Sequence, residues 1–290
     1  MPKFFVKNEQ IKNYSITIIG DDVNHIVNVL RMKKGDEIQV CNRDTGDNYN
    51  TEITQYSKNE VECEIKEKIN ETTESNVNIT LFQGIPKFEK MELIIQKNTE
   101  VGVKNIVPVI MERTIVKLDE KIAGKKLERW QKIAEIAAKQ SMRDIIPQVK
   151  NIIKLKDVNI DEFDAVLVAY ENEEHNMLKT ELKKLETEFA EKLMNVENIN
   201  QEEKNEKTNA DNAKITKNYH DNNTNNIKEA VSQYNIAIVI GPEGGISEKE
   251  IELLKEKGAK FVSLGRRILR TETAGIVMSG NIMYELESSY

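Results

Sequence analysis

The chain has 290 residues, enough for one large domain or two ordinary ones, and its net charge of −7 gives no overall signal for nucleic acid. Its two cysteines, Cys41 and Cys63, are too few for a disulfide framework, and we expect both to be buried thiols on strands. Because the chain shows no signal-peptide pattern and no apolar run of about 18 residues, the composition predicts a soluble cytoplasmic protein.

Residues 1–70 have the pattern of a β-rich unit with one helix. The helix is expected between Asp22 and Met32, and Gly35 is placed to end it. Its inward face is expected to carry Val23, Ile26, Val27 and Leu30.

Strand patterns follow this helix and are separated by tight turns. They cover Glu37–Cys41, the alternating positions Tyr49, Thr51 and Ile53, and the alternating positions Val61, Cys63 and Ile65. Short strands joined by tight turns predict a small barrel. Residues 72–76 are then expected to form a linker.

From residue 77 onward, strand and helix patterns alternate. The expected strands are 77–82, 106–110, 164–169, 235–240 and 261–264. The expected helices are one that carries Met91, Ile94, Ile95 and Val101 and ends at Gly102, one that carries Leu127, Trp130, Ile133, Ala134 and Ala137, and two more at 248–257 and 272–286. This alternation predicts a mostly parallel α/β sheet covered by helices.

One segment interrupts this alternation. Residues 195–226 are dominated by Asn, Lys and Glu, a composition that cannot bury enough apolar surface to offset its ordering entropy. Between Glu186 and Ser232, ten acidic and six basic residues contribute −4 to the net charge of −7. The rest of the chain is therefore only weakly acidic, and basic clusters can dominate locally.

The first of two glycine-bearing loops follows the strand pattern that ends at Ile240. Its glycines at 241, 244 and 245 permit close backbone approach, and Ser247 with Glu250 forms a capping box for the next helix. The loop lacks the lysine of a P-loop and does not fit the dinucleotide fingerprint. A nucleoside-like ligand held by backbone groups fits it better, although a tight turn without a ligand is the alternative.

The second loop runs from Leu264 to Ala274. Arg266, Arg267 and Arg270 place three guanidinium groups in five residues, where they could bind phosphate or stabilise an oxyanion. Thr271 is expected to cap the last helix. The alternative is a basic surface turn whose arginines pair with Glu272 or Glu243.

Other candidates are weaker. The histidines, His25, His175 and His220, are far apart in the chain, and no metal-ligand spacing is present, so we expect no metal. Lys87, Lys90 and Lys97 lie around an expected helix start and are interpreted as a solvated face.

Four segments together resemble the RsmE-type methyltransferases of the SPOUT superfamily, which methylate N3 of a uridine in 16S, small-subunit ribosomal RNA. They are His25–Arg31 with Gly35-Asp36, Gln96–Val103, Glu128–Trp130 with Glu135–Arg143, and the two C-terminal loops. The match runs nearly end to end and omits only the Asn-rich segment.

The resemblance implies an N-terminal PUA-like RNA-binding barrel at residues 1–72. It also implies a SPOUT-type methyltransferase domain at 76–290, with a knotted parallel sheet, helices on both faces and a disordered insertion at about 195–228. The knot is a trefoil in the C-terminal part. The family acts as a homodimer with S-adenosyl-L-methionine as cofactor, so we expect small-subunit ribosomal RNA and a second copy of the chain as partners, with no membrane and no metal.

The resemblance also assigns the two loops to the cofactor. The residues expected to wrap it are Ile240, Gly241, Pro242, Glu243, Gly244, Gly245, Leu264, Gly265, Ile268, Leu269, Arg270, Thr271, Thr273 and Ala274. For catalysis we expect Arg270, or alternatively Arg143, to stabilise the anion on the uridine oxygens, and Glu243 to act as base or to orient an arginine. The residues expected to contact RNA phosphates are Lys3, Arg31, Lys33, Lys34, Arg43, Arg113, Arg129 and Arg143.

Two other functions compete with this interpretation. A ribose 2′-O methyltransferase would use the same cofactor loops, and a non-catalytic RNA-binding ribosome assembly factor could keep the fold without the reaction. A nicotinamide dehydrogenase is disfavoured because the dinucleotide fingerprint is missing.

Overall fold

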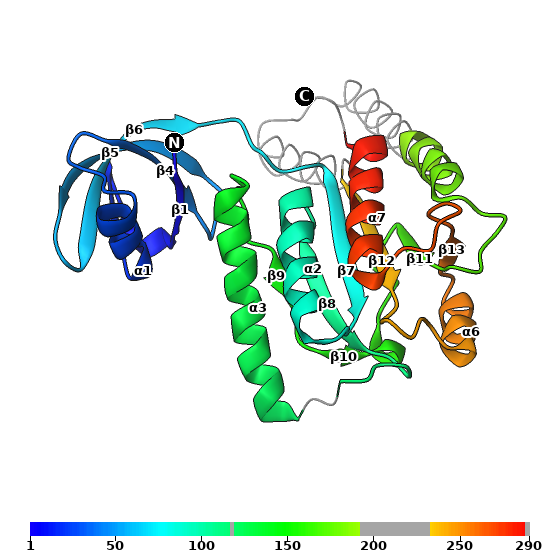
Figure 1. The fold of residues 1–290 in the computed structure, drawn as a ribbon. Coiled ribbons are helices and arrows are strands. Elements are labelled where there is room, and N and C mark those ends of the chain that lie inside the picture. Colours follow the sequence, from blue (N-terminus) through cyan, green and yellow to red (C-terminus); the bar gives the residue numbers. More distant parts are fainter. Residues whose placement is uncertain (117–118, 192–232, 288–290) are drawn as a thin grey trace, which may run out of the picture. The chain divides into compact units, whose positions relative to one another are not determined.

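A computed structural model of the chain describes residues 1–116, 119–191 and 233–287 (Figure 1). The chain divides into two compact units, Met1–Glu74 with Glu128–Gln148, and Ser75–Leu127 with Val149–Tyr290. The division falls within α3 (Glu120–Gln140), the helix expected from its apolar spacing. The insertion expected at about 195–228 lies outside the described residues. Within the described ranges, no helix combines the length and the apolarity that crossing a membrane requires.

The first unit contains a six-stranded sheet that forms an open half-barrel. In spatial order its strands are β1 (Lys3–Val6), β4 (Glu37–Asn42), β5 (Asn48–Tyr56), β6 (Glu60–Ile69), β3 (Ser15–Ile19) and β2 (Ile11–Lys12). β1 runs parallel to β4, and the other neighbours are antiparallel. The pairing of β5 with β6 shifts register twice, and such irregularities bend a sheet. The strands predicted after residue 36 are thus confirmed.

The helix predicted in this unit is present but ends earlier than expected. It consists of α1 (Asp21–Asn24) and a π-helical turn, His25–Val29. Arg31 ends it by adopting a left-handed conformation with φ of 55°, so the prediction that Gly35 ends it was wrong. Gly35 instead lies in the turn before β4, where its N–H donates to the carbonyl of Ile53 at 2.8 Å. Leu30 lies at the turn and is 41% exposed, so it is not part of the inward face.

Alternate residues of the half-barrel strands fill its core with Val23 and Ile26 of the helical segment. Both cysteines are buried on strands, as predicted. Burial raises the pKa of the Cys41 thiol to about 12 and that of the Cys63 thiol to about 11. Neither thiol therefore forms a reactive thiolate near neutral pH.

The second unit contains the predicted parallel sheet. In spatial order its strands are β10 (Ile153–Lys154), β8 (Asn105–Ile110), β7 (Val77–Gly84), β12 (Tyr234–Ile240), β11 (Ala165–Ala169) and β13 (Lys260–Val262), and the short β9 (Gln148–Val149) pairs with β8. The neighbours β10–β8, β8–β7, β7–β12, β12–β11 and β11–β13 are all parallel. The carboxyl ends of the central strands therefore meet at one edge.

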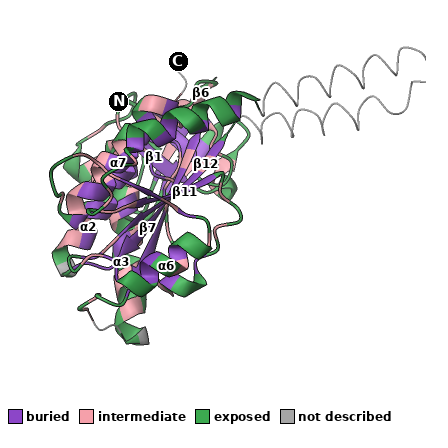
Figure 2. Cartoon of the chain, turned by 90° about the vertical axis from the view of Figure 1, so that its right-hand side faces the viewer, coloured by how far each residue is buried: buried purple, intermediate pink, exposed green. Residues whose placement is uncertain are grey.

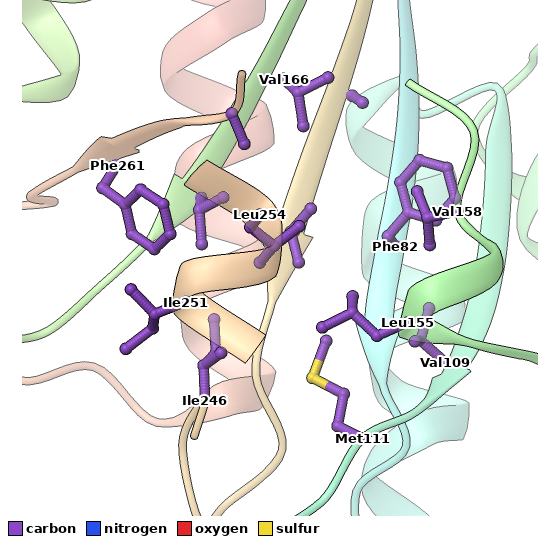
Figure 3. Close-up of a cluster of buried hydrophobic side chains, with 14 of the residues drawn as sticks. Phe82, Val109, Met111, Leu155, Val158, Val166, Ile246, Ile251, Leu254 and Phe261 are labelled. Atoms are coloured by element: carbon purple, nitrogen blue, oxygen red, sulfur yellow. The ribbon is translucent and has the colours of Figure 1, made fainter. Parts of the chain in front are cut away.

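Helices cover both faces of this sheet. On one face, α6 (Glu248–Glu256) inserts Ile251 and Leu254 into a core that includes Phe82 of β7 and Val166 of β11 (Figure 3). On the other face, α2 (Phe88–Val101) and α7 (Thr271–Leu286) lie side by side (Figure 1). Strands β7, β11 and β12 are accordingly buried (Figure 2). Gly102 ends α2 with φ of 111°, as predicted.

Buried polar groups join α2 to α7. Ser279 Oγ donates to Asn98 Oδ1 at 3.0 Å, and both side chains are fully buried. A Cβ added to Gly275 would lie 3.6 Å from Asn98, an ordinary contact distance, so α7 packs closely against α2 at this turn. A further helix at 178–191, which the sequence did not indicate, buries Leu178, Leu182, Leu185 and Phe189.

Candidate functional site

The two glycine-bearing loops meet at the carboxyl edge of the parallel sheet. They enclose a cavity of about 430 Å³ with the residues that follow β11. Its lining consists of Lys90, Ala169, Tyr170, Glu171, Ile240, Gly241, Pro242, Glu243, Gly245, Ile246, Ser263, Leu264, Gly265, Arg266, Arg267, Ile268, Leu269, Arg270, Thr271 and Ala274. In open parallel sheets, ligands bind outside the carboxyl ends of the strands, as this cavity would allow.

Thr271 connects the second loop to the first. Its hydroxyl donates to the carbonyl of Gly241 at 2.6 Å and accepts from Gln83 Nε2 at 2.9 Å. Thr271 is the first residue of α7, and Arg270 occupies the capping position, so the expectation that the Thr271 hydroxyl caps this helix was wrong. The hydroxyl instead ties the beginning of α7 to the ends of β12 and β7.

The first loop is held from two sides by close backbone packing. A Cβ added to Gly84, at the end of β7, would lie 2.6 Å from the ring of Pro242. On the other side, Arg113 Nη1 donates to the carbonyl of Gly244 at 2.9 Å, and a Cβ on Gly244 would lie 2.9 Å from the Cβ of Arg113. The main chain of the loop therefore stays close to its neighbours, and its fixed position suits recognition by backbone groups. The capping box predicted for Ser247 and Glu250 begins α6 directly afterwards.

Lys90 lies between two carboxylates beside the cavity. Its Nζ is 3.3 Å from Glu243 Oε1 and 3.1 Å from Glu272 Oε2. The interpretation of Lys90 as part of a solvated face was therefore incomplete. Glu243 and Glu272, which were considered as partners of the second-loop arginines, form ion pairs with Lys90 instead. Burial would raise the pKa of the Glu243 carboxyl, but hydrogen bonds from the Lys87 amide and from Lys90 lower it below its ordinary value.

The arginines of the second loop remain exposed. Arg266, Arg267 and Arg270 line the cavity, and none of them forms an ion pair with another described residue. The two nearby carboxylates, Glu243 and Glu272, contact Lys90 instead, so the described ion pairs leave these three guanidinium groups without a carboxylate partner. An exposed cationic rim of this kind suits an anionic ligand.

Most residues expected at the cofactor site line this cavity. The exceptions are Gly244, whose carbonyl is held by Arg113, and Thr273, whose amide donates to the carbonyl of Arg270. The motifs missed Lys90 of α2 and the group Ala169, Tyr170 and Glu171. The latter group could have been found, because its position at and just after the end of a predicted parallel strand puts it at the same edge of the sheet.

Two of the expected phosphate contacts do not fit the structure. Lys3 is 5% exposed and pairs with Asp144, and Arg143 is 4% exposed and pairs with Glu74 at 2.6 Å. Their charges face carboxylates inside the first unit, so neither side chain presents its charge to solvent. Because the Arg143 guanidinium is buried and paired with Glu74, it also does not suit the role of alternative catalytic residue. The exposed members of the expected set are Arg31, Lys33, Lys34, Arg43, Arg113 and Arg129.

Comparisons with known proteins agree over the whole chain. The RNA methyltransferase domain family matches residues 73–197 and 189–283, and the RNA methyltransferase PUA domain family matches residues 18–66. The ribosomal RNA small subunit methyltransferase E of Bacillus subtilis is 34% identical over 99% of this chain and 98% of its own length. The protein of that name from Aquifex aeolicus is 30% identical over 96% and 98%. A solved structure of that methyltransferase from Neisseria gonorrhoeae, bound to S-adenosyl methionine, is 27% identical, covers 98% of this chain and 97% of its own, and gives a TM-score of 0.72.

Proposed function

Because this chain belongs to the ribosomal RNA small subunit methyltransferase E family, we propose that it uses S-adenosylmethionine to methylate N3 of a uridine in small-subunit ribosomal RNA. The observation that carries the proposal is the cavity at which the two loops meet, closed by the bond from Thr271 to Gly241. The family resemblance extends over the full chain, which supports the reaction as well as the fold.

The cavity fits an adenosyl ligand. Its main-chain groups come from two fixed loops, and the close packing of Gly84 against Pro242 leaves no room for a side chain there. Gly265, with φ of 116°, gives the second loop a turn that other residues rarely adopt. S-adenosylmethionine would supply an electrophilic methyl group on its sulfonium. The loops would hold it and keep water from the reacting atoms.

Uridine N3 carries a proton and is a poor nucleophile until a base, here water or hydroxide from solvent, takes that proton. Arg270 supports the removal, because its exposed guanidinium lines the cavity and could stabilise the negative charge that spreads over O2 and O4. Glu243 suits an orienting role better than that of base, since its lowered pKa and its bonds to Lys87 and Lys90 favour the ionised, fully engaged state. We therefore assign Glu243 to holding Lys90 and the first loop.

The proposal extends to the two domains, the RNA contacts and the assembly of the protein. We assign residues 1–72 to a PUA-like RNA-binding domain and residues 76–290 to the methyltransferase domain. The phosphate contacts would come from the exposed side chains Arg31, Lys33, Lys34, Arg43, Arg113 and Arg129. We also infer a homodimer, a C-terminal trefoil knot and no metal requirement. Since small subunits are assembled in the cytoplasm, the enzyme would work there.

Nucleoside analysis of ribosomal RNA tests the proposal. Cells that lack the protein should lose one 3-methyluridine from the small-subunit RNA, and the wild-type chain should restore it. Loss of a 2′-O-methylated nucleoside would indicate the ribose-modifying alternative. If no modified nucleoside changes and the purified chain binds no S-adenosylmethionine, the assembly-factor alternative would replace the enzymatic one.

A further inference from the structure

Glu171 is a cavity residue that no recognised motif contains. It follows β11, which pairs with the strand that bears the first loop, and it lines the cavity. A Cβ added to Gly245 would lie 3.0 Å from Glu171 Oε1, so the carboxylate lies against the turn of the first loop. The position is thus fixed by two separate features, the end of a neighbouring parallel strand and the glycine turn.

Two carboxylates, Glu171 and Glu243, line the cavity, and they differ in whether other residues already bind them. Glu243 accepts from the Lys87 amide at 3.1 Å and pairs with Lys90 at 3.3 Å. Glu171 has no hydrogen bond or ion pair with any residue that the structure describes. Arg113 comes near the same turn, but its Nη1 donates to the carbonyl of Gly244. The oxygens of Glu171 are therefore available to a ligand.

An ionised carboxylate can only accept hydrogen bonds, and a ribose ring offers two adjacent hydroxyl donors. In Rossmann dinucleotide-binding folds, an acidic residue about 20 residues after the glycine turn accepts a hydrogen bond from the ribose 2′-OH. Glu171 would do the same chemistry from a different place in the chain. Resting on the proposed function, we propose that Glu171 accepts hydrogen bonds from the ribose hydroxyls of S-adenosylmethionine. Glu171 would then determine cofactor specificity together with the main-chain groups of the loops.

Calorimetry on the full-length chain tests this assignment without any need for turnover. The variant is Glu171→Ala, and the matched control is Glu174→Ala, which removes an exposed carboxylate from the same segment. The ligands are S-adenosylmethionine, its uncharged-sulfur product S-adenosylhomocysteine, and the 2′-deoxy and 3′-deoxy forms of that product. Glu171→Ala should lower the affinity for S-adenosylhomocysteine by about ten-fold or more. A loss of this size is expected when one hydrogen bond to a charged group is removed. Glu174→Ala should leave its affinity unchanged.

The deoxy ligands decide which part of the ligand Glu171 contacts. At least one of them should lose less affinity than the parent ligand when Glu171 is replaced by Ala, because a hydroxyl from which the carboxylate would accept a hydrogen bond is missing. Three results would overturn the assignment: unchanged affinity for S-adenosylhomocysteine, an equal loss for the parent and both deoxy forms, or a loss confined to the sulfonium ligand. The proposed function would still stand in each case, and it fails separately if the wild-type chain binds neither parent ligand.

Discussion

Gly84 gives the sharpest test of how the cofactor loop is held. A Cβ at this position would lie 2.6 Å from Cδ and N of Pro242, whereas ordinary contacts begin at 3.4 Å. Gly84→Ala must therefore move the first loop or the end of β7 by about 0.8 Å. Overpacking of this kind costs about 1–3 kcal/mol. If the loop absorbs the strain, affinity for S-adenosylmethionine should fall by about 5- to 150-fold.

A graded set of glycine variants makes the test quantitative. Gly275→Ala places its Cβ 3.6 Å from the nearest atoms, an ordinary contact, and Gly124→Ala in α3 meets nothing within 4 Å. Cofactor affinity is measured by calorimetry with S-adenosylmethionine, and stability by thermal unfolding. Gly84→Ala should lower both far more than Gly275→Ala does. Gly124→Ala should leave both unchanged or raise the stability slightly, because alanine favours helix. Equal affinity and equal melting temperature for Gly84→Ala and Gly124→Ala would refute the argument.

Three further outcomes follow from the charged groups around the cavity. Arg270→Ala should lower turnover at saturating cofactor by about 100- to 1,000-fold, and full turnover would refute its role. Because the pKa of Glu243 is lowered, its ionised form stabilises the fold above the unfolded value of 4.5. The stability advantage of wild type over Glu243→Gln in denaturant titrations should therefore shrink as the pH falls below that value, and a constant difference would contradict the shift. Replacing Arg266 and Arg267 with Gln should reduce the slope of RNA affinity against salt, and an unchanged slope would remove them from the RNA contact.

The sequence predicts α3 and the strands of the parallel sheet well because they have long apolar patterns. Trp130 and its neighbours in α3, and the run that becomes β12, bury the residues that their periodicity indicates. The first-unit helix was less predictable. Its end depends on Arg31 in a left-handed conformation, which this residue type adopts rarely, whereas Gly35 is the common choice for a helix end. The preference of glycine for helix ends therefore predicted the wrong residue as the end of this helix.

The two loops of the site could be found from sequence, but their side-chain partners could not. A threonine before a helix suggests a cap, and only the folded chain brings the Thr271 hydroxyl to Gly241, 30 residues away. The same holds for Lys3, which looks like a free terminal cation but is buried against Asp144. In both cases the favoured local interaction loses to a group that the tertiary fold presents.

The ion pairs of Lys90 with Glu243 and Glu272 bear on how the second-loop arginines function. If Lys90 did not occupy Glu243 and Glu272, these carboxylates would be free to attract the arginines of the second loop, and the cationic rim would lose its availability for RNA. Lys90→Met should therefore weaken RNA binding more than the loss of one surface charge does. Lys97→Met is the matched control, because Lys97 lies on the same helix and pairs only with Glu100 among the described residues. Filter binding over a series of salt concentrations, with calorimetry to show that the cofactor still binds, measures the difference. Equal RNA affinities for the two variants would mean that Lys90 does not keep the arginines available.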